Sequence, residues 1–282
     1  MFKKYDLNNS DLRLTKNHDI KIGDYVDYKK QVCKKPWGYE FLAFINKKIG
    51  IWILHVKKNS GTSIHTHFKK DTFLTVLNGK LKLEMVDEID IINKGNFCFI
   101  PKRKFHGLSA LEDDTIFMEI EIYDNDVSFS DKNDLLRLID KYKRAKTGYE
   151  NSVTIIKKEL QKFNYFEINN NFKTKLFNTT LICNNFKNLT NKKKSKVILL
   201  EEQIFSNGTI LKEGSLFNYE DLKNFDLDDQ LFLQFINNDE ITDKKIISSE
   251  EELKFLKNKL KENNKKIILT CGCFDILHVG HI

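Results

Sequence analysis

The chain has 282 residues, of which 40% are hydrophobic, and its formal net charge is +7. This length suffices for two domains, and 22 phenylalanines supply apolar side chains for real cores. No apolar stretch approaches the length of a membrane-spanning helix, and none follows the first residues as in a signal peptide. The sequence therefore predicts a soluble, globular, cytoplasmic protein without a membrane partner.

The positive charge belongs to a generally lysine-rich composition. Only residues 192–196 form a dense basic run, and this run contains no aromatic side chains that would stack on bases. We therefore expect no nucleic-acid partner. The five cysteines are an odd number without the spacing of a disulfide framework, which favours reduced thiols in a cytoplasm.

The first part of the chain, residues 1–148, has the pattern of an all-β domain. From about residue 41 to residue 122 it consists of short apolar segments separated by Gly and Asn. The dipeptide Asn78-Gly79 is typical of a hairpin turn. We therefore expect several antiparallel strands in this part.

Three histidines lie within this β-like region. His65 and His67 are two residues apart, so their side chains project from the same face of a strand. His106 ends a later segment that also contains Gly95 and Pro101. This segment places a third imidazole on another strand.

The stretches Gly61–His67 and Gly95–His106 resemble the paired motifs of the cupin superfamily. The resemblance implies a small antiparallel β-barrel with a metal or ligand site inside it. Neutral imidazoles at His65, His67 and His106 suit Zn, Fe, Mn or Ni, and leave coordination positions open for water or substrate. Histidines of cupin-like barrels also hydrogen-bond substrate without any metal, and both interpretations are open.

The first of these motifs departs from the cupin pattern at one position. Where the family often has a metal-binding glutamate, this chain has Thr72, preceded by Asp71. Adjacent strand residues point to opposite faces, so Asp71 replaces the glutamate only if the backbone bulges there. His55, on the preceding apolar strand, is predicted to be a core or pocket histidine.

Two flanking stretches narrow the type of cupin. Lys35–Glu40 resembles the lead-in of cupins related to the type II bacterial mannose-6-phosphate isomerase, and Asp134–Arg144 resembles the short helical tail that follows them. We assign Trp37 and Tyr39 to packing at the barrel edge in preference to substrate contact. Five basic residues near the histidines form either a cationic rim for a phosphorylated sugar or a set of solvated loop charges. They are Lys69, Lys70, Lys102, Arg103 and Lys104.

The middle part, residues 149–247, is β-like and carries no chemical motif. Its apolar segments are residues 196–200, 209–212 and 230–235. The dipeptide Asn207-Gly208 marks a turn between them. We interpret this part as a β-rich connecting domain, with a degenerate second β-barrel as the alternative.

The last part, residues 248–282, begins with the capping-box pattern of a helix and continues into the apolar strand Ile267–Leu269. Gly272 then allows a sharp turn. His278 and His281 lie three apart, on one face of a first helical turn whose free N–H groups attract phosphate. This arrangement predicts the opening of a nucleotide-binding domain.

The run from Gly272 to His281 closely resembles the signature of the cytidylyltransferase-like nucleotidyltransferases, in the form typical of heptose-phosphate nucleotidyltransferases. The resemblance implies attack by a sugar or polyol phosphate on the α-phosphorus of CTP or ATP, with Mg, and release of pyrophosphate. It also implies that His278 and His281 are catalytic. The nucleotide-binding residues that it implies are Gly272, Cys273, Phe274 and Gly280.

The whole sequence thus predicts a mainly β fragment of a bifunctional nucleotidyltransferase. It would comprise a cupin barrel, a β-rich connecting segment and the first helix and strand of an α/β, Rossmann-like transferase domain. Because later elements of such a domain follow this signature, we expect residues 1–282 alone to be inactive as a transferase. Two alternatives stay open: a cupin that is a metal-dependent sugar-phosphate isomerase or epimerase, and a non-catalytic ligand-binding cupin. The expected partners are a sugar or polyol phosphate and a nucleoside triphosphate, and a homodimer is also open.

Overall fold

The computed structural model describes most of the first 237 residues and a few positions after them. The described residues are 2–21, 23–29, 31–124, 131–143, 154–157, 171–176, 179–191, 195–201, 203–206, 208–227, 229–237, 250, 253–254, 257–258 and 261. The chain divides into two compact units, Met1–Asp239 and Glu240–Ile282, and the helices and strands below belong to the first. Strands dominate this unit, so the predicted mainly β class is confirmed.

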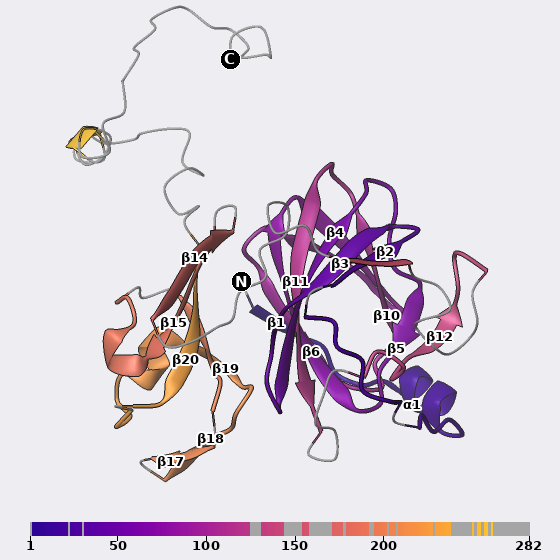
Figure 1. Ribbon diagram of the computed structural model, residues 1–282, viewed down its shortest axis with the longest axis horizontal. Helices are drawn as coiled ribbons and strands as arrows, with labels where there is room; N and C mark the ends of the chain where they lie inside the picture. The colour runs from indigo at the N-terminus through magenta and orange to yellow at the C-terminus, as the bar shows by residue number, and fades with distance from the viewer. Residues whose placement is uncertain are drawn as a thin grey trace, which may run out of the picture. The chain divides into compact units, whose positions relative to one another are not determined.

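Two sheets of this unit face each other (Figure 1), and the apolar side chains between them form the barrel core. In spatial order the first sheet contains β1 (Phe2–Lys4), β9 (Phe97–Ile100), β6 (Lys70–Asn78), β11 (Thr115–Tyr123), β4 (Ile49–Val56), β3 (Gly38–Ile45), β2 (Gln31–Lys35) and β13 (Thr154–Lys157). The second contains β12 (Leu136–Ile139), β5 (Ile64–Thr66), β10 (His106–Ala110), β7 (Lys80–Met85) and β8 (Ile89–Asn93). Apart from the parallel pair β1 and β9, neighbouring strands of both sheets are antiparallel. This is the antiparallel barrel that the cupin resemblance implied.

The hairpin between β6 and β7 turns at the predicted position. Gly79 separates the two strands and has a φ of +77°, a conformation that residues with a Cβ rarely adopt. A Cβ at Gly79 would also lie 2.5 Å from the hydroxyl oxygen of Thr115. Glycine therefore satisfies both the backbone geometry and the close approach of β11.

A third sheet covers the outer face of the first one. Its strands, in spatial order, are β14 (Phe172–Leu176), β15 (Thr179–Asn185), β20 (Leu231–Asn237), β16 (Lys196–Leu199) and β19 (Leu216–Asn218). A separate hairpin joins β17 (Ile204–Ser206) to β18 (Thr209–Leu211), and the 3-10 turns η2 (Phe186–Asn188) and η3 (Tyr219–Leu222) lie between strands. The predicted β segments near 196–200, 209–212 and 230–235 are thus confirmed.

Strand β11 is buried on both faces, between the barrel core and the third sheet. Phe117 belongs to the barrel core, together with Trp52 and Leu108. Met118 and Ile120 point the other way and pack in a second core that contains residues of the third sheet. Because successive strand residues face opposite sides, a central strand buried on both faces needs an almost uninterrupted apolar sequence.

The predicted helical tail at Asp134–Arg144 is wrong. Residues Leu136–Ile139 form strand β12, which pairs with β5 in antiparallel register. Leu136 is fully buried there, and the edge of β5 satisfies the backbone hydrogen bonds of the segment. Tertiary pairing therefore overrides the local pattern of this short apolar stretch.

The single described α-helix of the barrel, α1 (Asn9–Thr15), begins with a capping box formed by Asn8 and Asp11. Among the described residues, no helix combines the length and the apolarity needed to cross a bilayer. The domain boundaries near 148 and 247 stay predictions. The predicted transferase residues Gly272, Cys273, Phe274, His278, Gly280 and His281 lie outside the described residues.

Candidate metal centre and cavity

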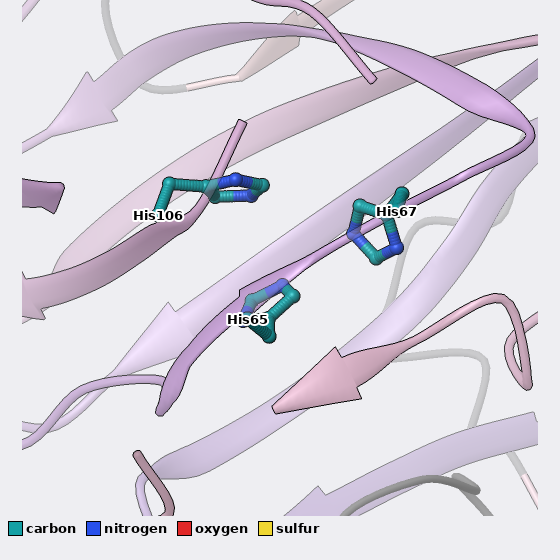
Figure 2. Close-up of side chains that lie close together, drawn as sticks. All are labelled: His65, His67 and His106. Carbon is teal, nitrogen blue, oxygen red and sulfur yellow. The ribbon is translucent and has the colours of Figure 1, made fainter. Parts of the chain in front are cut away.

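The structure brings His65, His67 and His106 together at one wall of the barrel (Figure 2). His65 lies on β5 directly opposite His106 on β10, and His67 follows the end of β5. The ring centroids are 4.7 Å apart for His65 and His106, 5.0 Å for His65 and His67, and 5.7 Å for His67 and His106. One potential ligand nitrogen from each ring lies within 4.8 Å of the others.

Each of the three imidazoles is oriented by a backbone carbonyl. The Nδ1 atom of His65 lies 2.7 Å from the Ser63 carbonyl oxygen, that of His67 lies 2.5 Å from Asp134 O, and that of His106 lies 3.0 Å from Lys104 O. A carbonyl only accepts, so each Nδ1 carries the proton and donates. The Nε2 lone pair of every ring is therefore left for a further ligand, as in metal sites whose histidines are held from outside.

The chemistry of this donor set fits a divalent transition metal. Burial lowers the pKa of His106 to about 4, and burial lowers the pKa values of His65 and His67 well below their usual range. The three rings are thus neutral at pH 7, which is the protonation state that ligates metals. The Nε2 atom of His106 is buried and has no hydrogen-bond partner among the described residues. A metal ion would remove the cost of that unpaired acceptor.

Among the described residues, neither Thr72 nor Asp71 adds a carboxylate to the three histidines. Thr72 lies on the inner face of β6, whereas Asp71 points outward and accepts a hydrogen bond from the backbone N–H of Lys102 at 2.8 Å. The pairing of β6 with β11 continues in register through both residues, and the pairing of β6 with β9 includes Thr72. The bulge that would bring Asp71 inward is therefore absent.

A cavity of about 60 Å³ adjoins the histidines inside the barrel. His65 and His67 form part of its wall, and Trp37 and Leu54 contribute apolar surface. Its charged lining residues are Lys35, Glu40, Glu119, Glu121, Lys132 and Arg137. So many ionisable groups make this lining polar, which distinguishes the cavity from an apolar core and makes it a candidate site.

Most of these charges belong to one buried network centred on Glu121. Lys70 Nζ lies 2.6 Å and Lys132 Nζ lies 3.0 Å from the same oxygen of Glu121. The other oxygen accepts hydrogen bonds from the indole of Trp52 and the hydroxyl of Tyr123, each at 3.1 Å. Glu121 is thereby fully satisfied, as a buried carboxylate must be.

Lys132 extends the network toward the cavity wall. Its Nζ lies 4.0 Å from Glu40 and 3.7 Å from the centre of the Trp52 ring, and Glu40 is also 3.4 Å from Lys35. Burial lowers the pKa of Lys132, but Glu121, Glu40 and Glu119 more than offset this effect and raise it. Lys132 is consequently a permanent cation of the site.

Glu119 differs from the other two carboxylates. It lies on β11 between the cross-strand neighbours Trp52 and Leu74, and no described residue hydrogen-bonds it or forms an ion pair with it within 4.0 Å. Burial raises the pKa of Glu119 to about 7; Lys132 opposes the rise, and Glu40 and Glu121 add to it. This carboxyl group therefore changes protonation state near neutral pH.

Sequence reasoning missed the carboxylates of β11. The available signal was the pair Glu119 and Glu121, two apart in the otherwise apolar strand Thr115–Tyr123. The spacing places both on one face, opposite to the apolar residues of the third-sheet contact. Isolated charges within a buried strand need partners or a function, and here both occur side by side.

Two of the five basic residues near the histidines, Lys70 and Lys104, are buried and are therefore not solvated loop charges. Lys70 is buried in the network, and Lys104 is buried against Asp11 of α1 at 3.2 Å. Lys102 pairs with Asp124 at 2.5 Å, and the Arg103 guanidinium lies 5.1 Å from the centre of the Phe68 ring. Buried acidic partners distant in sequence decide the positions of Lys70 and Lys104.

His55 and Trp37 differ in their relation to the candidate site. His55 stacks on Tyr39 with ring centroids 4.4 Å apart, and burial lowers its pKa to about 4. His55 is thus a packed histidine away from the three-histidine cluster, as predicted. Trp37 is buried and lines the cavity, so it belongs to the site as well as to the packing.

The chain is similar to curated protein sequences over a short stretch and to solved structures over about a third of its length. No family model matches the chain. The bifunctional protein HldE of Campylobacter jejuni subsp. jejuni serotype O:2 is 63% identical over 38 residues, which are 14% of this chain and 8% of that protein. HldE of Sulfurimonas denitrificans is 53% identical over 32 residues, 11% of this chain and 7% of the relative. The match thus spans less than a tenth of the length of these curated relatives.

Solved structures similar to the chain include KdgF from Halomonas sp., with 18% identity, coverage of 37% of this chain and 91% of that chain, and a TM-score of 0.31. A cupin 2 domain-containing protein from Halorhodospira halophila has 16% identity, coverage of 27% and 54%, and a TM-score of 0.25. The polyketide cyclase RemF from Streptomyces resistomycificus has 16% identity, coverage of 36% and 80%, and a TM-score of 0.30.

Proposed function

We propose that the barrel binds one divalent transition metal, Zn, Fe, Mn or Ni, through His65, His67 and His106. The observation that carries the proposal is the set of three neutral imidazoles, each held at Nδ1 by a carbonyl, one of which has a buried Nε2 without a partner. Three protein ligands leave coordination positions for water or substrate, which is the arrangement of catalytic metal sites.

We further propose that the bound substrate is a small sugar-type compound and that the reaction is an isomerisation or epimerisation. A divalent cation at the histidines would polarise a carbonyl or hydroxyl group. The cavity lining combines the cations Lys35, Lys132 and Arg137 with three carboxylates, so it offers charged donors and acceptors for the hydroxyl groups and the phosphate of such a substrate. A sugar phosphate combines both features.

The test is the metal content of the purified chain 1–282, measured by inductively coupled plasma mass spectrometry after dialysis. We expect about one metal ion per chain, and loss of most of it in His65→Ala, His67→Ala and His106→Ala. The matched control is His55→Phe, which keeps a ring against Tyr39 and is expected to retain the metal. A metal-free wild-type protein would contradict the proposal and favour a barrel that binds its ligand without metal.

A second function, that of a nucleotidyltransferase in a longer bifunctional protein, is supported by a different observation. The signature from Gly272 to His281 and the short, strong identity to HldE both favour it. We propose CTP or ATP, with Mg, and a sugar or polyol phosphate as its substrates in the cytoplasm. His278 and His281 would stabilise the phosphates, and Gly272, Cys273, Phe274 and Gly280 would contact the nucleotide.

The second function is tested by pyrophosphate release from CTP or ATP in the presence of heptose or polyol phosphates. We expect a protein that continues through a whole transferase domain to be active, and its His278→Ala variant to be inactive. The metal-site variant His106→Ala of the same protein should release pyrophosphate normally. Activity that survives in the His278→Ala variant would contradict the assigned role.

A further inference from the structure

Glu119 occupies a central position in the cavity wall. It lies in the middle of β11, on the face that looks into the barrel, and lines the same cavity as His65 and His67. Its cross-strand neighbours on that face, Trp52 and Leu74, are apolar side chains of the barrel core. The carboxyl group therefore lies between buried apolar neighbours, in the lining that it shares with two of the three histidines.

The three carboxylates of the cavity have different surroundings. Glu121 forms ion pairs with two lysines and accepts hydrogen bonds from an indole and a phenol. Glu40 forms ion pairs with Lys35 and Lys132. Glu119 has no hydrogen-bond or ion-pair partner within the part of the chain that the structure describes. The carboxylates of Glu121 and Glu40 are thus paired within the network, and the carboxyl group of Glu119 can bind a molecule in the cavity.

The charged surroundings keep this available carboxyl group between two protonation states. Glu121 on its own strand and Glu40 on β3 disfavour a further negative charge, whereas Lys132 and Lys70 favour it. The cavity also holds Lys35 and Arg137. With the network charges opposing one another, burial dominates and brings the pKa of Glu119 to about 7, where a group both accepts and releases protons readily.

We propose that Glu119 is the proton-transfer group of this cavity and acts on a hydroxy-carbonyl substrate of the sugar type. The inference rests on the proposed function of the barrel and adds the residue that carries the proton. The ionised carboxylate takes the proton from the carbon next to the substrate carbonyl. The C–H electron pair forms a C=C bond and the carbonyl π pair moves onto oxygen, which gives an enediolate. For isomerisation, a proton passes from the neighbouring hydroxyl oxygen to this oxygen, and Glu119 returns its proton to the former carbonyl carbon while a C=O bond forms at the other carbon. For epimerisation, the enediolate turns its other face to Glu119 and takes the proton back at the original carbon. No oxidant or reductant is consumed.

The first experiment measures proton exchange with the metal-loaded chain 1–282 in D₂O. Aldose and ketose phosphates, and the same sugars without phosphate, are followed by ¹H NMR for loss of the signal next to the carbonyl. We expect exchange with the wild type and a decrease of at least about 100-fold in Glu119→Gln, which keeps the size of the side chain. The control is Glu112→Gln, an exposed partner of Lys80 in a turn, which should exchange normally.

The second experiment observes the carboxyl group directly and needs no substrate. In infrared titrations of the metal-free protein, we expect a protonated carboxyl band that disappears as the pH rises through about 7. The band should be absent from Glu119→Gln and present in Glu119→Asp. Equal circular dichroism and metal content of the variants and the wild type would show that they are folded.

The outcomes separate this inference from the function on which it rests. A wild-type chain that binds no metal refutes the metal centre, while the infrared band still decides whether Glu119 carries a proton at neutral pH. Full metal occupancy without exchange for any member of the panel overturns the proton-transfer role. Undiminished exchange in Glu119→Gln, or an unchanged infrared band in that variant, overturns it as well.

Discussion

The two faces of the first sheet are both buried and largely apolar, yet the inner face also carries the buried carboxylates of the cavity. The outer face presents Met118 and Ile120 of β11 to the third sheet, in a core formed by apolar side chains. The inner face of the same strand presents Glu119 and Glu121 to the cavity. Burying ionisable groups costs free energy that apolar packing would not. The outer face therefore contributes stability alone, whereas the inner face combines the barrel core with the charged lining of the cavity.

The largest expected effect on stability belongs to the outer face. Met118 is fully buried between two sheets, so Met118→Ala should lower the free energy of unfolding by about 4 kcal/mol through lost contacts and a new cavity. Urea unfolding measures this change, and metal content should stay that of the wild type. Met118→Leu, which conserves volume, should cost less than about 1.5 kcal/mol. Loss of metal in a folded Met118→Ala protein would show that the outer face also affects the metal site, which contradicts the separation of the two faces.

The next effect concerns the ion network of the inner face. Lys70→Ala leaves Glu121 without its closest cation, so we expect a loss of about 3 kcal/mol in the free energy of unfolding. The double variant Lys70→Ala, Glu121→Gln removes the stranded charge and should be more stable than the single variant. The same unfolding measurements compare the two. A single variant as stable as the wild type would show that the pair contributes no net stability.

A smaller effect should appear in the pH dependence of the metal-free protein. The pKa of His106 is about 4 in the folded state and about 6.5 in an unfolded chain, so only the unfolded state gains a proton between these values. Stability should therefore fall with decreasing pH, by about 2 kcal/mol for this residue at pH 5. His106→Leu should lose correspondingly less between pH 7 and pH 5 in urea unfolding. Equal losses would mean that protons reach His106 in the folded state.

The smallest expected effect lies away from both faces. Phe205 is 74% exposed on the hairpin of β17 and β18. Phe205→Ser should change the free energy of unfolding by no more than about 0.5 kcal/mol and leave the metal content unchanged. A large loss of stability in calorimetry would reveal packing of this hairpin that its exposure does not indicate.

Local patterns in the sequence predict much of this molecule. Alternating and continuous apolar segments predicted the mainly β class, because they reflect which faces of a strand are buried. Asn78-Gly79 predicted a hairpin turn, since its geometry needs the positive φ that Gly79 adopts. The spacing of His65 and His67 predicted side chains on a common face, and the structure places their rings 5.0 Å apart. Each of these features depends on residues close together in the chain.

Features that depend on distant partners were decided by the tertiary structure. The segment Leu136–Ile139 is a strand because it pairs with the edge of β5, and Lys104 is buried because Asp11 of α1 pairs with it. Likewise, Glu121 is neutralised by Lys70 of β6 and Lys132 of a loop, whereas Glu119 on the same face has no such partner among the described residues. Sequence spacing determines the face on which a side chain lies. Only packing determines its partners, its solvation and hence its protonation state.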